Sequence, residues 1–340
     1  MKYCAYLTIL LCLAGTCYAQ DPNFSQFFVS PLTLNPALTG KFNGNLRVAG
    51  NYRDQWPEIS KAYITSTVSV DAPIMRSKLS DIDTLGVGLM AMTDKSANGI
   101  LSGNFIAVST SYHKGLDEDG LHSIGIGFQG SYTNKRLDGS KLNFLDELDE
   151  NGGWTIPSSE PIDNRTVNTS YFDFSVGGLY NGSTDGYNNF YLGVSAYHIN
   201  RPKESFTGDI FYQLNPRVTF NAGGSLPLED RSRTIYASAL YSKQGGATNV
   251  VIGGAAGFLL NDDEDNPTSF FAGAWTRFNN VNDAIIPYLG LEYNGLRFGA
   301  SYDVNISSLK TASQSRGGIE LSLIYIKRPA GYKAIPCPSF

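Results

Sequence analysis

Apolar and polar positions alternate along much of this chain. The first clear stretch places Leu46, Val48, Gly50 and Tyr52 in alternation with Arg47, Ala49, Asn51 and Arg53. The same period of two recurs in residues 64–70, 123–129 and 296–304. Because successive side chains of a strand point to opposite faces, each stretch has one apolar face and one face of glycine, small polar and charged residues. The pattern predicts strands, and the second face is typical of a barrel interior.

Roughly fourteen such segments are predicted, an even number that returns both chain ends to the same side of a membrane. They start near residues 44, 61, 84, 103, 121, 171, 189, 214, 232, 248, 268, 284, 296 and 316. If the first strand runs outward, the longest connections, residues 134–170 and 199–213, are extracellular. The two-residue hairpin signal Asn294-Gly295 and the acidic turn at 262–265 are then periplasmic. We predict an all-β, antiparallel transmembrane barrel with short periplasmic turns and longer extracellular loops.

The start of the chain has the pattern of a signal peptide. Lys2 precedes a short apolar run over residues 7–14, and Cys17-Tyr18-Ala19 precedes Gln20 as a cleavage pattern. Cys17 follows Leu-Ala-Gly-Thr, so lipoprotein processing is a less favoured alternative. We divide the chain into a signal peptide (1–19), an N-terminal plug segment (20–43), an outer-membrane barrel (44–327) and a C-terminal tail (328–340).

The predicted plug segment is rich in aromatic residues. Phe24, Phe27 and Phe28 share one face at helical spacing, and Pro31 ends any helix begun there. Asn35-Pro36 favours a turn. Since exposed aromatic side chains are costly, we expect the three phenylalanines to pack into the periplasmic mouth of the barrel.

Composition narrows the possible functions. Charged residues make up 17% of the 340-residue chain and aromatic residues 12%. The 31 acidic residues outnumber the 26 basic ones, which argues against a nucleic-acid partner. Three of the four cysteines fall in the predicted signal peptide, so Cys337 has no internal disulfide partner in the processed chain.

No catalytic or cofactor motif is present in the sequence. Gly86-Val87-Gly88 and Gly125-Ile126-Gly127 fall inside alternating strands and are interpreted as strand glycines. His113 and His122 lack neighbours with metal-ligand spacing. The acidic residues 146–150 lack the ligand spacing of a calcium loop and are interpreted as part of a solvated loop. We predict a non-enzymatic protein with no cofactor and no metal site.

Several sequence blocks carry a resemblance to a known family. The block from Asp21 to Gly40, DPNFSQFFVSPLTLNPALTG, resembles the start of the PorP/SprF family of type IX secretion and gliding-motility membrane proteins. NYRDQW at residues 51–56, SYDVN at 301–305 and GGIELSL at 317–323 are similar to further family blocks. The end, PCPSF, is similar to a family tail that usually reads Cys-Pro-Arg-Phe, and Ser339 departs from it.

The resemblance implies a barrel that receives a secreted adhesin, or another substrate with a type B C-terminal domain, and retains it at the cell surface. It also implies contact with other components of the type IX machinery. In the longest loop, Phe144, Trp154 and Ile156 are candidate apolar anchors and Arg165 belongs to a candidate polar rim. A diffusion channel or apolar-solute transporter is the alternative, and an outer-membrane enzyme is less favoured because no site emerges.

Overall fold

The structure is a computed structural model. It describes residues 21–57, 63–74, 82–208, 212–228, 232–261, 268–279, 283–307 and 310–328. The predicted signal peptide, the acidic turn at 262–265 and the tail from residue 329 onward lie outside these residues.

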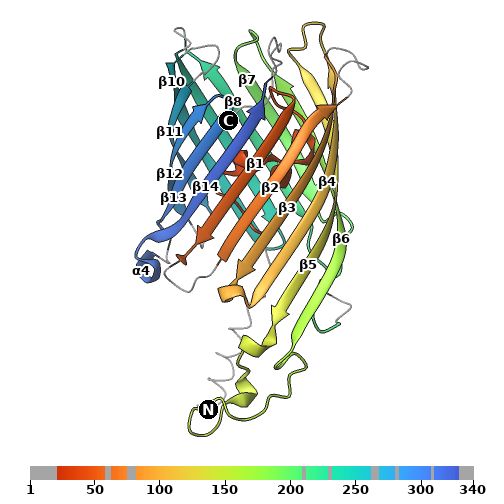
Figure 1. Cartoon of the computed structure of the whole chain (residues 1–340), viewed down its shortest axis with the longest axis vertical. Helices are drawn as coiled ribbons and strands as arrows, with labels where there is room; N and C mark the ends of the chain where they lie inside the picture. The colour runs from red at the N-terminus through yellow and green to blue at the C-terminus, as the bar shows by residue number, and fades with distance from the viewer. Residues whose placement is uncertain are drawn as a thin grey trace, which may run out of the picture.

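Within the described residues the chain forms a closed barrel of fourteen antiparallel strands (Figure 1). The strands are β1 (Leu46–Gln55), β2 (Tyr63–Ile74), β3 (Thr84–Ser96), β4 (Leu101–Gly115), β5 (Ser123–Asp138), β6 (Thr166–Gly182), β7 (Asn189–Tyr197), β8 (Arg217–Pro227), β9 (Arg233–Gln244), β10 (Ala247–Asn261), β11 (Thr268–Phe278), β12 (Ala284–Tyr293), β13 (Leu296–Asn305) and β14 (Arg316–Lys327). Each strand pairs with its neighbours in sequence, and β1 pairs with β14 to close the barrel.

The helical elements are short. Three lie in the N-terminal segment: η1 (Phe27–Val29), α2 (Pro31–Leu34) and η2 (Pro36–Leu38). Four lie in connections: η3 (Ala97–Gly99), η4 (Gly139–Lys141), η5 (Leu145–Glu147) and α4 (Lys310–Ser313). Among the described residues, no helix is long and apolar enough to cross a bilayer.

The predicted barrel and its strand number are confirmed. Thirteen strands start within three residues of the predicted positions, whereas β6 starts at Thr166 instead of near 171. The difference arises because β5 and β6 project beyond the other strands, as the lower part of Figure 1 shows. Residues 166–170, predicted to belong to a loop, pair with β5 in register, so that Asp138 faces Thr166.

The two ends of the barrel differ in their connections. We call the end with the β5–β6 and β7–β8 connections, residues 139–165 and 198–216, the loop end. The opposite end, which holds the tight β12–β13 turn at Asn294-Gly295, is the turn end. Asn294 and Gly295 have φ angles of 48° and 75°, as a two-residue hairpin of this hand requires. A second tight turn, Gly245-Gly246 between β9 and β10, lies at the loop end, so short connections occur at both ends.

The two faces of the strands divide as the alternation predicts. Val108, Phe172, Leu192 and Phe298 point outward and are between 49% and 68% exposed, so the outer wall is an apolar surface. The inward face is not uniformly small and polar, however. From β6 to β12 it carries large apolar side chains, among them Trp275 and Tyr288, which are buried against the N-terminal segment. The lumen therefore has an apolar wall, and one group of its ion pairs joins β1 to β2, β13 and β14.

Candidate functional site: the plugged lumen and the loop end

The N-terminal segment lies inside the barrel and extends along the lumen. Asp21 contacts Gln244 at the loop end of β9, through a 2.8 Å hydrogen bond from its backbone N–H. Gly40 donates a 2.7 Å hydrogen bond to Asp71, near the turn end of β2. Residues 21–43 thus run from the loop end to the turn end and fill the lumen as a plug, rather than closing one mouth alone.

The plug buries the aromatic residues that sequence reasoning singled out. Phe24 and Phe27 are 5% and 4% exposed. Phe28 packs against Trp275 and Tyr288, with ring centroids 4.8 and 5.6 Å away. Aromatic pairs at such distances stabilise a fold beyond the area they bury. These side chains meet the apolar wall and hold the plug against β11 and β12.

A buried ion network holds the plug against the polar wall. Arg53 and Arg277 each place a guanidinium nitrogen 2.7 Å from Asp303, and Arg53 also lies 3.0 Å from Glu320. Glu320 accepts hydrogen bonds of 2.8 and 2.9 Å from the backbone N–H groups of Ser25 and Gln26. The network therefore joins the plug to β1, β11, β13 and β14 in one connected set of charges.

Asp21 forms a second polar contact at the loop end. Its carboxylate lies 2.7 Å from His198 and 3.3 Å from Arg217, and His198 also lies 3.0 Å from Asp173. Burial alone would lower the pKa of His198, but Asp21 and Asp173 outweigh it and raise that pKa to about 9. Burial would likewise raise the pKa of Asp21, but Arg217 and His198 hold it well below its ordinary value. The plug therefore begins at an ion pair between a charged histidine and a carboxylate.

Glycines on the inner wall make room for the plug backbone. A Cβ on Gly86 would overlap the carbonyl of Thr39, and one on Gly127 would overlap the backbone of Pro36 and Ala37. Gly86 and Gly127 are thus positions where the plug backbone approaches the strands closely. His113 lies in the same region, fully buried, with Nε2 2.7 Å from the carbonyl oxygen of Ala37.

A cavity of about 480 Å³ lies between the plug and the loop end. Asp21, Pro22 and Asn23 line its lumen side, and the strand ends around Asp94 and Lys135 line its walls. Glu204, from the β7–β8 connection, accepts hydrogen bonds from Lys135 at 2.7 Å and from Tyr171 at 2.8 Å. These bonds anchor that connection to β5 and β6 beside the cavity.

The long β5–β6 connection is folded, yet its apolar side chains are exposed. Leu148 and Trp154 form an isolated bridge, and Asp146 accepts hydrogen bonds from Ser158 and Ser159. Hydrogen bonds to the carboxylate lower the pKa of Asp146. The backbone N–H of Ser159 makes the largest contribution, and the hydroxyls of Ser158 and Ser159 add to it. The acidic residues thus cap turns within the loop, and the described residues contain no cluster of three or more metal-ligating side chains.

The loop residues proposed from sequence lie on this connection. Trp154 is 50% exposed and Ile156 47%, while Phe144 is half-buried and Arg165 exposed. They share one loop but are separate from the buried networks of the lumen. The alternation in the sequence placed Arg53 on the polar face of its strand, but sequence reasoning missed Asp21, Ser25 and Gln26 as partners of the lumen charges. Only the aromatic content of residues 21–43 signalled that this segment is buried.

An apolar outer wall, a closed ladder of fourteen strands and a charged, filled lumen define an outer-membrane β-barrel. The family described as type IX secretion system membrane protein PorP/SprF matches residues 16–325. The chain therefore belongs to this family and is located in the outer membrane.

Several solved structures of outer-membrane barrels are similar to this chain at low sequence identity. A TodX monoaromatic hydrocarbon channel mutant is 13% identical, with 88% of this chain and 94% of that chain covered and a TM-score of 0.47. BamA from Haemophilus ducreyi lacking POTRA domains 1–3 is 11% identical, with 83% and 70% covered and a TM-score of 0.41. KdgM porin is 8% identical, with 82% and 98% covered and a TM-score of 0.38. No curated protein matches this chain.

Proposed function

We propose that this barrel receives a secreted protein with a type B C-terminal domain, such as an adhesin, and retains it at the cell surface. The loop end faces the exterior in this proposal, and the turn end faces the periplasm, where other type IX components reach it. The barrel acts by binding and performs no catalysis.

The observation that carries the proposal is the β5–β6 connection. It holds Leu145, Trp154 and Ile156 exposed, at 81%, 50% and 47%, on a loop that its own hydrogen bonds order. Aromatic and aliphatic side chains held on a rigid support make good interface anchors, because little conformational entropy is lost when a partner binds. Asp163 and Arg165 supply a polar rim at the base of the same loop.

The filled lumen favours this proposal over a diffusion channel. A channel needs a continuous polar path, whereas here the plug packs against the apolar wall and ion pairs fix its other face. The alternative, a channel or apolar-solute transporter, requires the plug to leave the lumen, which would break the bonds of Ser25 and Gln26 to Glu320.

Two changes in the long loop test the proposal. Deletion of residues 146–161 leaves every strand intact and is expected to release the secreted partner into the medium while the barrel stays in the outer membrane. The double substitution Trp154→Ser with Ile156→Ser is expected to weaken retention without shortening the loop. Leu116→Ser, which alters a 57% exposed apolar residue at the turn end, is the matched control.

Surface retention is measured by comparing cell-bound and released partner in whole-cell and medium fractions. If both loop variants keep the partner at the surface, the binding site lies elsewhere. If deletion of the whole barrel releases no secreted protein but reduces solute uptake, the channel alternative replaces the proposal.

A further inference from the structure

The cavity of about 480 Å³ at the loop end contains a carboxylate that has no counter-charge. Asp94, on β3, lines this cavity, and its Oδ1 accepts a 2.5 Å hydrogen bond from the hydroxyl of Thr65. Among the described residues, no lysine, arginine or histidine nitrogen lies within 4.0 Å of this carboxylate. Its second oxygen, Oδ2, has no donor in the described part of the chain and is open to solvent.

The other charged residues on the described wall of this cavity are paired. They are Asp21, Arg53, Lys135, Glu204 and Arg277. Lys135 donates hydrogen bonds of 2.7 and 2.8 Å to the two carboxylate oxygens of Glu204. Both arginines lie 2.7 Å from Asp303, and Asp21 lies 2.7 Å from His198. Asp94 therefore leaves the described wall of the cavity with one unmatched negative charge.

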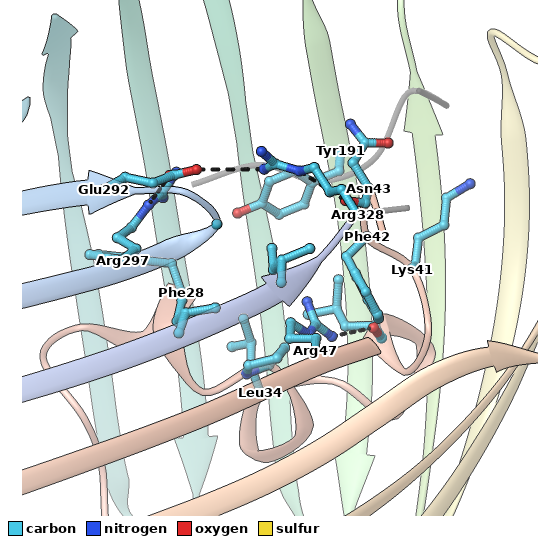
Figure 2. A pocket seen from close by; sticks show the side chains of 15 residues that line it. Phe28, Leu34, Lys41, Phe42, Asn43, Arg47, Tyr191, Glu292, Arg297 and Arg328 are labelled. Atoms are coloured by element: carbon cyan, nitrogen blue, oxygen red, sulfur yellow. Dashed lines mark hydrogen bonds and ion pairs between the residues drawn. The ribbon is translucent and has the colours of Figure 1, made fainter. Parts of the chain in front are cut away.

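The smaller cavity at the turn end, of about 130 Å³, differs in this respect (Figure 2). Glu292 is the carboxylate on its described wall, and it is shared by Arg297 at 2.6 Å and Arg328 at 3.5 Å. Figure 2 shows both of these contacts as dashed lines. A cationic ligand would find no unpaired carboxylate on the described wall there, so the two ends of the lumen differ in the charge that they can receive.

Aromatic side chains line the same loop-end cavity as Asp94. Trp56 and Tyr63 form an edge-to-face pair with ring centroids 5.8 Å apart. The Phe105 ring covers Gly103, where a Cβ would come 3.0 Å from it, and Gly103 pairs in register with Asp94. Trp56 has a φ of 58°, a strained backbone for a bulky residue, and such strain is concentrated at ligand sites. A carboxylate among aromatic rings attracts a cation by its charge and by cation–π interaction.

We propose that this cavity binds an arginine side chain of the secreted protein. The guanidinium pairs with the free oxygen of Asp94 and packs against the aromatic rings. Arginine suits the cavity better than lysine, because its planar, weakly hydrated guanidinium can pair with a carboxylate and stack on a ring at once. A volume of 480 Å³ lies within the range of about 300–1,000 Å³ that is usual for small-ligand pockets.

The inference rests on the proposed function for the identity of the partner, whereas the chemistry of the cavity does not depend on it. The cavity opens at the same end as the β5–β6 connection, beside the β7–β8 connection that Glu204 anchors. A partner held by the exposed loop could therefore place one side chain in the lumen mouth.

Saturation-transfer NMR with the full-length barrel in detergent tests the cavity without any partner. The probe is Nα-acetyl-arginine amide, compared with Nα-acetyl-citrulline amide, which has a similar shape and no charge. Citrulline should bind at least about tenfold more weakly, because a charge-assisted hydrogen bond is lost. Asp94→Asn should weaken arginine binding by a similar factor and remove the difference between the two amides. Asp163→Asn, a matched change on the exposed loop, should leave both unchanged.

Equal binding of the two amides by the parent barrel would overturn the proposal, and this comparison does not depend on the folding of any variant. Full arginine binding by Asp94→Asn would overturn it as well. Binding of methyl glucoside in place of arginine, unaffected by Asp94→Asn, would make the cavity a saccharide site instead.

The whole-cell retention assay distinguishes failure of this inference from failure of the proposed function. Asp94→Asn should increase the fraction of partner released into the medium. If deletion of residues 146–161 releases the partner but Asp94→Asn does not, the partner does not use this cavity and the inference is wrong. If neither change releases it, the proposed function fails and the assignment to the partner falls with it, whereas arginine binding is still decided by the two amides.

Discussion

Removal of one carboxylate should destabilise both the plug and the barrel that encloses it. Asp303 is 1% exposed and accepts hydrogen bonds from Arg53, Arg277 and Ser25 at 2.7 to 2.8 Å. Two arginines and two carboxylates, Asp303 and Glu320, make the network neutral. Asp303→Ala leaves two buried guanidinium groups with one carboxylate, and breaking a buried ion pair in this way costs about 3–5 kcal/mol.

Urea unfolding in lipid vesicles, followed by tryptophan fluorescence, measures this cost. Asp303→Ala should lower the free energy of unfolding by about 3–5 kcal/mol. Asp303→Asn keeps an acceptor oxygen and should lose less. Asp163→Ala removes a carboxylate whose hydrogen bonds are to the adjacent Asn164 on the exposed loop, and should change stability by no more than about 0.5 kcal/mol.

A thiol inside the plug distinguishes release of the plug from unfolding of the barrel. Val29 is 2% exposed and makes no polar side-chain contact, so Val29→Cys in a Cys337→Ser background is a mild change. It should resist maleimide in the parent barrel and react when Asp303→Ala is added. A loss of less than 1 kcal/mol together with a still-protected thiol would refute the view that this network holds the plug.

Three further predictions address the rest of the molecule. His198 has a pKa raised to about 9, so the Asp21–His198 ion pair is fully present below pH 6.5 and is lost as pH rises through about 9. Protease cleavage near residue 21 should therefore increase as the pH rises through this range. His198→Gln should abolish this pH dependence. Phe298→Arg places a charge on the outer wall and should lower the stability of the barrel by about 2–4 kcal/mol if the residue lies near mid-bilayer. The loss is measured as a lower temperature for the heat-dependent gel shift. Equal tolerance of Phe298→Leu and Phe298→Arg would contradict the outward orientation of Phe298. An epitope inserted after Asn151 should be labelled on intact cells, whereas one inserted at Gly295 should be inaccessible, and the reverse result would invert the barrel.

The fold was predictable because its signal is local. Alternation in β1 and β13 assigned each residue to a face without knowledge of any distant contact. The plug was harder to predict, because its partners are far away in sequence: Ser25 and Glu320 are 295 residues apart. The aromatic content of residues 21–43 indicated burial, but no local pattern indicates which wall a segment meets.

The large inward-facing residues of the apolar wall were also hard to predict, because they too depend on contacts with the plug. The sequence predicted a lumen lined by small and polar side chains, and this is found where the strands carry the ion pairs. In β11 and β12, however, Trp275 and Tyr288 face inward. An inward aromatic residue is unfavourable in a water-filled pore and favourable against a phenylalanine of a plug. Once the strands are assigned, large inward-facing side chains therefore indicate which part of the wall packs against the plug.

The position of the ion network has a consequence for how the barrel closes. Arg53 lies on β1 and Glu320 on β14, and these two strands form the seam at which the ends of the sheet meet. Because the backbone of Ser25 and Gln26 also binds Glu320, the plug contacts the seam from inside. An unclosed barrel would leave these charges without partners in a membrane, at a cost of several kcal/mol. Closure of the seam pairs these charges, and the plug adds backbone and hydroxyl hydrogen bonds to the same carboxylates, so insertion of the plug and closure of the seam stabilise each other.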